Sequence, residues 1–337
     1  MVRNYNKIGK EIAETGFFSE YLPPCFKLDK KVFNRIPVVN CDLIQPYSFT
    51  MSRYNGNDAR RSIFIPEIGA YVVANNFIKE NNIIRQLVEL TESNEASFSP
   101  ILGENDSIVR HEETYNGFTE ELEGTSSQYI DNIAKKIINS AGSKKILKLD
   151  ISNCFSSVYM HIIPAILLGY EEAEENYNKF LKDSNDPTIS QTYIIYRKLD
   201  EVIRRQNMNR TNGLLPGPLT SKIIAEAIFT RIDSELKSEG LKFARYVDDY
   251  EVYIYDNEIK LVISTFTKIL KRYGFSLNNE KTEEVEFPYY VAENLEKIFK
   301  KHIKDDLENS ELMELFNSYF TLEKSGTKGA VRYLLKT

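Results

Sequence analysis

The sequence predicts an α+β fold, in which an antiparallel sheet carries helices packed against it. From residue 144 onward the segments follow the order strand, helix, helix, strand-turn-strand, helix and short strand. The strand-like runs are rich in Val, Ile, Tyr and Phe, whereas the helix-like runs repeat apolar residues at helical spacing. With 337 residues, 42% hydrophobic and 27% charged, the chain can bury a substantial core in about two domains.

The N-terminal part of the chain contains one strand pattern and two helical patterns. Residues 60–66, RRSIFIP, predict a short strand that a proline ends. Residues 69–93 repeat apolar side chains at helical spacing, and we expect a break near Asn81 and Asn82. Residues 127–142 form an amphipathic pattern that ends at a glycine, which is typical of a helix C-terminus.

The first strand of the expected sheet is KKILKLDIS, residues 144–152, and it ends in an acidic residue. Residues 158–169 are apolar and helical but interrupted by a proline, and residues 192–207 predict a further helix. Residues 213–221, GLLPGPLTS, predict a loop, and residues 222–240 predict a helix that stops at a glycine.

The segment ARYVDDYEVYIYD, residues 244–256, predicts a tight hairpin with an unusual turn. Two strand-like runs flank Asp248 and Asp249, which we expect at or near the hairpin tip. Two like charges at such a point repel each other, so they need either water or a cation. A solvated turn is the ordinary explanation for an isolated Asp-Asp pair. Whether this pair instead binds a cation depends on the residues found elsewhere in the chain.

The elements after the hairpin complete the pattern. Residues 258–274 predict a helix, a short strand is expected near residue 284, and the sequence is helical from 291 to the end. A β-α-β-β-α-β order is the ferredoxin-like arrangement, whose sheet has helices on one face and leaves the other face open. In that topology the first strand ends beside the hairpin turn, so Asp150 would stand next to the paired aspartates.

Composition limits the class of protein. Cys25, Cys41 and Cys154 have no CxxC spacing, which favours a reducing compartment over a disulfide framework or a zinc site. The N-terminus has no apolar signal core, and no run approaches 18 apolar residues, so we expect a cytoplasmic protein with no membrane contact. Since the net charge is −6, nucleic-acid binding would have to use local patches or a metal.

Asp150, Asp248 and Asp249 would together form a site of hard oxygen ligands. Such sites suit Mg²⁺, which binds one or two carboxylates together with substrate phosphates. Two ions about 3.5–4 Å apart can activate an attacking hydroxyl and stabilise the leaving oxygen of a phosphoryl transfer. A cation would also explain why the chain tolerates the paired charges.

Four segments resemble successive palm motifs of reverse transcriptases, in the right order and at plausible spacing. They are LKLDISNCFSSVY (147–159), NGLLPGPLTSKIIAEAIFTRID (212–233), FARYVDDYEVYIYD (243–256) and GFSLNNEKTE (274–283). Residues 59–78, ARRSIFIPEIGAYVVANNFI, resemble the fingers segment of the same family, and the resemblance covers residues 55–290.

The resemblance implies a right-hand polymerase with a ferredoxin-like palm, fingers and a C-terminal helical thumb-like segment. We expect an N-terminal extension and fingers in residues 1–143 and the palm in residues 144–290. Residues 291–337 would be a thumb-like segment or the start of a C-terminal helical domain. DISNCFSSVYMHIIPAI, KTEEVEFPYY and SGTKGAVRYLL resemble bacterial abortive-infection (Abi-type) reverse transcriptases, which act in antiphage defence.

The family pattern assigns the metal site residue by residue. It makes Asp150 and Asp248 ligands of both metals, with the backbone carbonyl of Ile151 completing one site. Asp249 would be a weaker ligand or would support the others. Phe155 would lie under the sugar of the incoming nucleotide and exclude a 2′-hydroxyl, the alternative being a core phenylalanine.

Gly217 and Ser221 would lie under the nucleotide and the template, unless they simply begin a helix. Here the chain departs from the family, because the usual Pro-Gln-Gly is Leu215-Pro216-Gly217 and the glutamine that contacts substrate is missing. This departure puts ordinary templated copying in doubt.

Three basic residues are further candidates for the nucleotide site. Lys281 matches a lysine that protonates or binds the pyrophosphate, with a plain surface lysine as the alternative. Arg60 and Arg61 begin the fingers strand and could hold the triphosphate, with a solvated strand edge as the alternative.

The sequence therefore predicts a Mg²⁺-dependent enzyme, with Mn²⁺ as a substitute, that adds dNTPs to DNA in antiphage defence. Its partners would be dNTPs, the DNA product, an RNA template or noncoding RNA, and a partner protein or further copies of the chain. The primer would be a 3′-hydroxyl or a protein tyrosine. The alternatives are a silent polymerase-fold scaffold that binds nucleic acid in a defence complex and a palm-type nucleotide cyclase.

Overall fold

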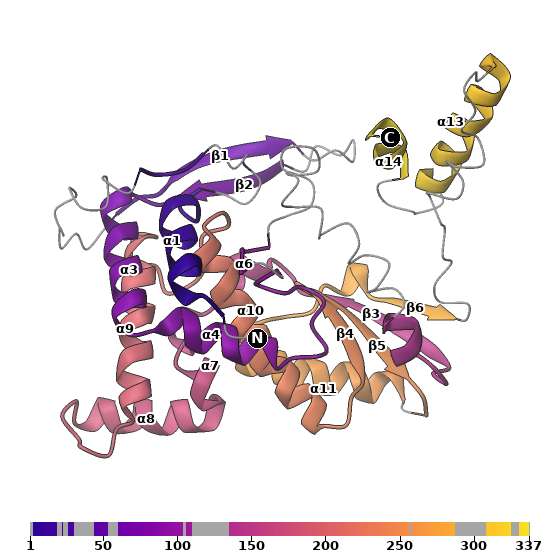
Figure 1. Cartoon of the computed structure of the whole chain (residues 1–337). Helices are drawn as coiled ribbons and strands as arrows, with labels where there is room; N and C mark the ends of the chain where they lie inside the picture. The colour runs from indigo at the N-terminus through magenta and orange to yellow at the C-terminus, as the bar shows by residue number, and fades with distance from the viewer. Residues whose placement is uncertain are drawn as a thin grey trace. The chain divides into compact units, whose positions relative to one another are not determined.

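The computed structural model describes residues 3–18, 22, 26–29, 44–52, 60–103, 106–109, 135–256, 258–286, 308–324 and 330–336. The chain divides into two compact units, residues 1–286 and residues 287–337 (Figure 1). In the first unit the elements are α1 (Tyr5–Thr15), β1 (Tyr47–Ser52), β2 (Arg60–Ile65), α3 (Ile68–Glu80), α4 (Ile83–Glu92), β3 (Lys145–Asp150), α6 (Cys154–Ser157), η3 (Met160–Ile162), α7 (Ala165–Leu168), α8 (Tyr170–Lys182), α9 (Gln191–Arg205), α10 (Leu219–Ser238), β4 (Phe243–Tyr246), β5 (Asp249–Ile254), α11 (Ile259–Arg272), η4 (Asn279–Lys281) and β6 (Glu283–Glu286). The second unit contains α13 (Asn309–Lys324) and α14 (Ala330–Lys336).

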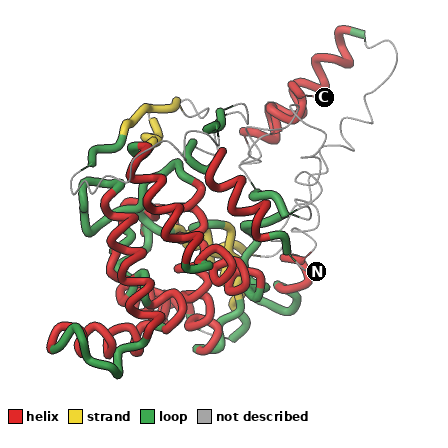
Figure 2. The backbone as a smooth tube through the Cα atoms, turned by 60° about the vertical axis from the view of Figure 1, so that its left-hand side comes forward, coloured by secondary structure: helices red, strands yellow, loops and turns green. Residues whose placement is uncertain are grey.

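The strands of the first unit form two antiparallel sheets. β1 and β2 make a two-stranded sheet that lies apart from the strands of the second sheet (yellow in Figure 2). The second sheet has the strand order β4-β5-β3-β6. The second sheet has β3 in the middle, between strands that come from much later in the sequence. This is the strand order of a β-α-β-β-α-β unit, and it confirms the predicted order of the strands from residue 144 onward.

One face of the four-stranded sheet packs on the core, and the other, which we call the polar face, carries charged side chains as well as the buried Ile146 and Tyr253, because successive side chains of a strand point to opposite sides. Leu147 and Leu149 of β3 and Val252 of β5 belong to the hydrophobic core. On the opposite face, Lys148 of β3 lies directly across from Glu251 of β5. The alternation therefore separates a packed face from a face that carries charges.

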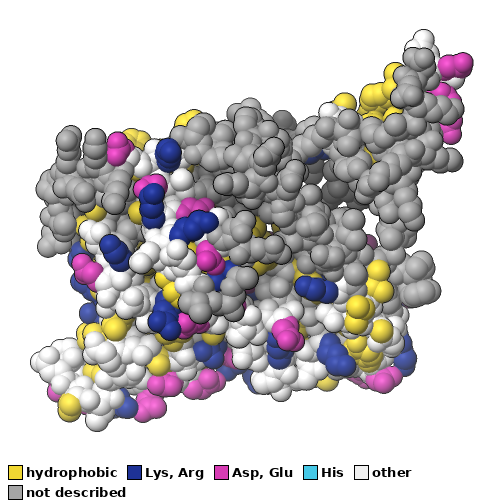
Figure 3. Space-filling view, viewed as in Figure 1, with side chains coloured by type: hydrophobic (Ala, Val, Ile, Leu, Met, Phe, Trp, Pro, Cys, Tyr) yellow, Lys and Arg dark blue, Asp and Glu magenta, His cyan; other side chains and the backbone are white. Residues whose placement is uncertain are grey.

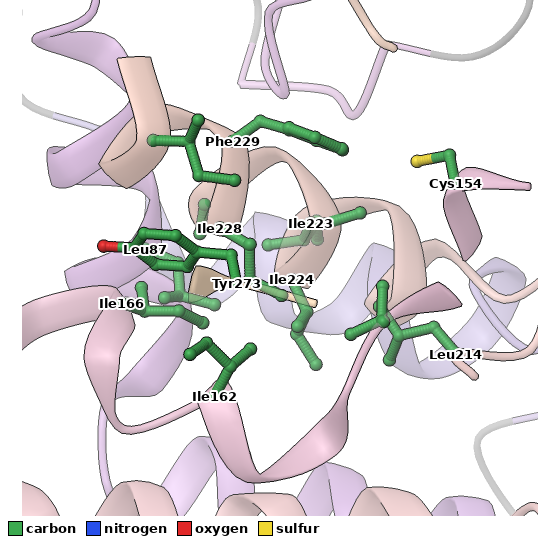
Figure 4. Close-up of a cluster of buried hydrophobic side chains, with 14 of the residues drawn as sticks. Leu87, Cys154, Ile162, Ile166, Leu214, Ile223, Ile224, Ile228, Phe229 and Tyr273 are labelled. Atoms are coloured by element: carbon green, nitrogen blue, oxygen red, sulfur yellow. The ribbon is translucent and has the colours of Figure 1, made fainter. Parts of the chain in front are cut away.

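Helices supply the rest of the core. α10 packs against α4, α7 and α11, and its side chains are buried along nearly its whole length. Figure 4 shows Ile223, Ile224 and Ile228 of α10 in one cluster with Leu87 of α4 and Ile166 of α7. A helix that is buried on all sides needs apolar residues around its full circumference, which is what this sequence has.

Several elements agree with the sequence analysis. α3 and α4 are separated at the predicted break, where Asn82 has a positive φ of 52°. β2, β3, α9 and α11 lie within two residues of the predicted boundaries, and β6 forms where a short strand was expected. Residues 135–139 are helical, while residues 127–134 of the same predicted helix lie outside the described residues.

Other elements differ from the sequence analysis. α10 begins at Leu219, three residues earlier than the predicted start at 222. Its N-cap is Pro218, so residues 219–221 of the predicted loop form the first turn of the helix. α1, β1 and α8 were not predicted. α8 has glutamates in its first turn and lysines in its last, which complement the helix dipole.

Candidate active site

The hairpin that carries the paired aspartates has a two-residue turn made of Val247 and Asp248. Val247 has a φ of 57°, which is a rare and unfavourable value for a β-branched residue. Asp249 is the first residue of β5 and not part of the tip. The sequence analysis thus places the hairpin correctly and the turn one residue too late.

β3 brings the third carboxylate to the hairpin. Asp150, the last residue of β3, lies directly opposite Asp249 in the antiparallel register. The backbone N–H of Ile151 donates to the carbonyl of Asp248 at 3.3 Å, which joins the turn to the end of β3. Since Asp150 and Asp249 are directly paired, their side chains share one face of the sheet, opposite the face that packs on the core.

The three carboxylates affect one another electrostatically. Asp249 is exposed as a residue, but the protein around its carboxyl group removes enough water to disfavour the charge. This desolvation, together with the charges of Asp248 and Asp150 and a hydrogen bond with Asp150, raises the pKa of Asp249 to about 6. The expected crowding of charge is therefore present in the fold.

Asp150 is buried, and the segment that leads into β6 contacts both its carboxylate and its backbone. The ammonium of Lys281 lies 2.7 Å from one carboxylate oxygen of Asp150, and the side-chain amide of Asn278 donates to the other at 3.0 Å. The backbone N–H of Asn278 also donates to the carbonyl of Asp150 at 2.8 Å. The hydrogen bond to Asp150 is the main cause that raises the pKa of Lys281.

The side chains of this site provide some, but not all, of the ligands that a divalent metal needs. Among the described residues, no group of three or more His, Cys, Asp and Glu side chains is gathered closely enough to hold an ion. Mg²⁺ requires only one or two carboxylates when phosphate oxygens supply other ligands. Asp150 and Asp249 satisfy that requirement, and a cation would offset the desolvation and the neighbouring negative charges that raise the pKa of Asp249.

Phe155 lies five residues after Asp150, in the single turn of α6. It is half-buried and packs against the hydrophobic core, and its carbonyl accepts a hydrogen bond from the N–H of Leu214 at 2.8 Å. Phe155 is thus attached to the loop that contains Gly217. Its ring has both a core contact and an exposed part, so the geometry is compatible with either expected role.

The space beside Gly217 is taken by β2. A Cβ at Gly217 would lie 2.4 Å from the carbonyl oxygen of Phe64, and the φ of Gly217 is +139°. The N–H of Phe64 donates to the carbonyl of Pro216 at 2.8 Å. The absence of a side chain at Gly217 therefore allows strand β2 to approach the backbone closely.

Ser221 lies in the first turn of α10 and is only 4% exposed, which leaves little of it for contact with a substrate.

The remaining expected residues are placed by their backbone alone. Arg60 and Arg61 start β2 and pair with Ser52 and Met51 of β1, while their side chains lie outside the described part of the structure. Sequence reasoning missed Asn278, although it stands in the quoted segment GFSLNNEKTE. It also missed Arg245, whose only signal is that it is a basic residue inside an apolar strand.

Among the described side chains of one face, charges of both signs are mixed. On the face shown in Figure 3, the described Lys and Arg side chains are interspersed with Asp and Glu. Cys154, the one cysteine among the described residues, is buried, and burial raises the pKa of its thiol. No helix in the described ranges is both long enough and apolar enough to cross a membrane.

Comparisons with known proteins bear on the fold and the family. Among solved structures, the chain is similar to telomerase from Candida albicans in complex with a fragment of telomeric RNA, with 13% identity over 78% of this chain and a TM-score of 0.43. It is also similar to apo telomerase from Candida tropicalis, with 15% identity over 78% of this chain and a TM-score of 0.42. A form of that telomerase truncated from the C-terminal domain gives 14% identity, 79% coverage and a TM-score of 0.40.

The chain spans 44%, 50% and 57% of the lengths of these three telomerase chains. No curated protein matches the sequence. The family model described as reverse transcriptase (RNA-dependent DNA polymerase) matches residues 81–304, which include all four segments quoted above for the palm but not the fingers segment 59–78. This match is to a family of nucleotide-polymerising enzymes, and it covers well over half of the chain. The protein belongs to the reverse transcriptase family.

Proposed function

We propose that the protein is a DNA polymerase of the reverse-transcriptase type that adds dNTPs at Asp150, Asp248 and Asp249. The observation that supports this most directly is the register that pairs Asp150 with Asp249, with Asp248 in the adjoining turn. Asp150 and Asp249 thereby lie side by side on neighbouring strands, and Asp248 precedes Asp249 in the turn. The raised pKa of Asp249 is in keeping with this assignment, because the charges of Asp248 and Asp150 contribute to it after desolvation.

Each residue has a distinct part in the proposed reaction. Asp150 and Asp248 are the proposed metal ligands, with Asp249 as a weaker ligand beside them. A bound divalent metal, Mg²⁺ or Mn²⁺, supplies activation of the attacking hydroxyl and stabilisation of the charge that develops on phosphate oxygens. Lys281 stands 2.7 Å from Asp150, and its ammonium group can pair with a phosphate instead once Asp150 has another cation as its partner.

The decisive experiment is incorporation of labelled dNTPs by homogeneous protein with Mg²⁺ or with Mn²⁺. A polymer or a ladder of products supports the proposal, whereas a small cyclic product would identify a nucleotide cyclase. The ion pair between Lys281 and Asp150 is the observation that favours a silent scaffold, because the lysine already neutralises the acid. No incorporation under any of these conditions would support that alternative.

We further propose that the enzyme belongs to the Abi-type group and makes specialised DNA in the cytoplasm of bacteria during antiphage defence. The support is the sequence resemblance together with Leu215 and Pro216, which replace the usual Pro-Gln. We propose a dedicated primer or template: a noncoding RNA, a partner protein, a tyrosine or another copy of the chain. Sequencing the nucleic acid that copurifies with the protein tests this, and generic cellular RNA would contradict it.

Phe155→Val should allow the enzyme to incorporate ribonucleotides. The substitution shortens the side chain that we place under the sugar, which would open space for a 2′-hydroxyl. The measurement is the ratio of rNTP to dNTP incorporation, in wild type and in variant. Phe180→Val, in α8, is the matched control, because it removes a ring outside the proposed site. An unchanged ratio in a variant that still uses dNTPs would show that Phe155 is not the gate.

The raised pKa of Asp249 predicts how stability depends on pH without metal. The folded-state pKa is about 6 and the ordinary value is 3.8, so between these values the folded state binds more protons than the unfolded state. Protonated Asp249 therefore favours folding at low pH, and this contribution is lost as the pH rises through about 6.

We expect the melting temperature in EDTA to fall more from pH 4.5 to pH 7 in wild type than in Asp249→Asn. Mg²⁺ should restore wild type more at pH 7 than at pH 5, because the ion favours the ionised acid. Parallel curves for the two proteins would contradict the assigned pKa.

A further inference from the structure

Arg245 of β4 is completely buried, which is unusual for an arginine, and two buried carboxylates from α10 surround it. Its Nε donates to Asp233 at 2.8 Å, and its two terminal nitrogens donate to the two oxygens of Glu226 at 2.9 and 2.7 Å. Phe229 of the same helix lies under the guanidinium, with the ring centroid 5.4 Å away. Arg245 thus uses the bidentate geometry that only a guanidinium offers.

One further hydrogen bond of Arg245 reaches the turn that carries Asp248. Its Nη1 donates to the carbonyl of Val247 at 2.9 Å. Val247 is the residue with the unfavourable φ of 57°, and it directly precedes Asp248. A residue in such a conformation is kept there by its surroundings, and this contact is one that holds it.

The register of the hairpin explains why Arg245 is on the opposite side from the acids. Arg245 pairs with Tyr250, whereas the next residue, Tyr246, pairs with Asp249. Because side chains alternate, Arg245 points into the core face of the sheet and Asp249 points to the polar face. Arg245 therefore lies behind the acids, where it can support the turn without meeting a substrate.

Other side chains complete the environment of Arg245. Tyr250 donates its hydroxyl to Asp233 at 2.8 Å, and the side-chain amide of Asn94 donates to the same carboxylate at 2.6 Å. Ser97 donates to Glu226 at 2.7 Å. The network thus joins the turn to α10, to β5 and to the segment that follows α4. Satisfied buried networks of this kind specify one geometry.

The backbone reinforces this connection. The N–H of Arg245 donates to the carbonyl of Ala96 at 2.8 Å, and the N–H of Phe98 donates to the carbonyl of Arg245 at 2.7 Å. β4 is therefore paired on its outer side with the segment after α4 as well as with β5.

Burial alone would lower the pKa of Arg245, but Asp233 and Glu226 outweigh it and hold the pKa above its ordinary value.

We propose that Arg245 is a positioning residue, which fixes the Val247–Asp248 turn so that Asp248 and Asp249 face Asp150. This inference rests on the proposed function. The network consists of Arg245 with the side chains of Glu226, Asp233, Tyr250, Asn94 and Ser97. A buried ion pair is rarely the most stable way to fill a core, since apolar residues of similar volume often do so at least as well. The arrangement instead gives the turn a single conformation.

Arg245→Lys is the test, because it keeps the positive charge but loses the fork that joins Glu226, Asp233 and the Val247 carbonyl. Arg204→Lys is the matched control. Arg204 forms a similar pair with buried Asp200, at 2.7 Å, but belongs to α9 and not to the network. Both variants are compared with wild type at a temperature well below every melting transition, so that the loss of stability itself does not enter the rates.

We expect Arg245→Lys to lower kcat by about 100-fold, the size of effect that a small misplacement of reacting groups produces. The KM for dNTP should change little, because Arg245 does not touch the nucleotide site. The metal concentration needed for half-maximal activity should rise, and Mn²⁺ should raise the melting temperature less than in wild type. Arg204→Lys should leave all of these values at the wild-type level.

A kcat and a metal response equal to those of Arg204→Lys would overturn the proposal and leave Arg245 with a purely structural role. If Arg245→Lys does not fold, the isosteric variant Glu226→Gln replaces it, and an unchanged kcat in that variant overturns the proposal in the same way. An inactive wild type would contradict the proposed function. In that case the rise in melting temperature that Mn²⁺ causes still tests the inference. If Mn²⁺ raises the melting temperature of Arg245→Lys as much as that of wild type, the inference is overturned.

Discussion

Replacing Asp150 or Asp248 with asparagine is expected to reduce nucleotide incorporation by at least about 1000-fold. Each substitution removes one negative charge and almost no volume, so the fold should survive while the affinity for the metal falls. The metal contributes several kcal/mol to the stabilisation of a phosphoryl-transfer transition state, and about 1.4 kcal/mol corresponds to a factor of ten in rate. The measurement is steady-state incorporation of labelled dNTP at saturating Mg²⁺.

Asp256→Asn is the matched control for these two variants. Asp256 follows β5 at the end opposite the turn, where it is exposed and pairs with Lys144. The same chemical change at that position should leave incorporation unaffected, because exposed ion pairs contribute little. Wild-type rates in both Asp150→Asn and Asp248→Asn would show that the site lies elsewhere.

Gly217→Ala is expected to produce the largest loss of stability. Its φ of +139° is rarely adopted by L side chains, and such backbone strain costs about 1–3 kcal/mol. The added Cβ would also lie 2.4 Å from the carbonyl of Phe64, and this backbone atom cannot move without displacing β2. The free energy of unfolding should therefore fall by about 3 kcal/mol or more, a large part of the stability of a typical domain.

Gly240→Ala separates the steric effect from the effect of a positive φ. Gly240 has a φ of +79° and no heavy atom within 4 Å of an added Cβ. This variant should lose only about 1–2 kcal/mol, the cost of a left-handed conformation. Denaturant unfolding of both variants gives the comparison, and equal losses would contradict the predicted clash with β2.

The candidate acids could be predicted from the sequence because their placement depends on local rules. Period-two alternation and a short turn determine which face of a strand a side chain occupies, and both are visible in ARYVDDYEVYIYD. The order of elements from residue 144 then brings Asp150 to the hairpin, as the pairing with Asp249 shows. The start of α10 was misjudged, because the sequence GLLPGP suggests a loop that continues further than it does.

Contacts between distant segments could not be predicted in this way. Asn278 and Asp150 are 128 positions apart, and Asn94 and Asp233 are 139 positions apart. Neither pair produces a repeating pattern in the sequence, because a hydrogen bond between two side chains needs only two polar residues and no regular spacing. The sequence therefore showed that Gly217 permits a close approach, but only the tertiary structure showed that the approaching group is Phe64.

The sequence by itself indicated the family, through the resemblance of four motif segments, and it predicted the order of the strands and the three candidate acids. The strand order and the acids could be predicted because hydrophobic period and turn chemistry act between neighbouring residues. The tertiary structure decided what holds the acids in place, namely Lys281 and Asn278 on Asp150 and the buried Arg245 behind the turn. The physical reason is that burial and pairing of a charge depend on every segment that packs around it, and those segments meet only when the chain has folded.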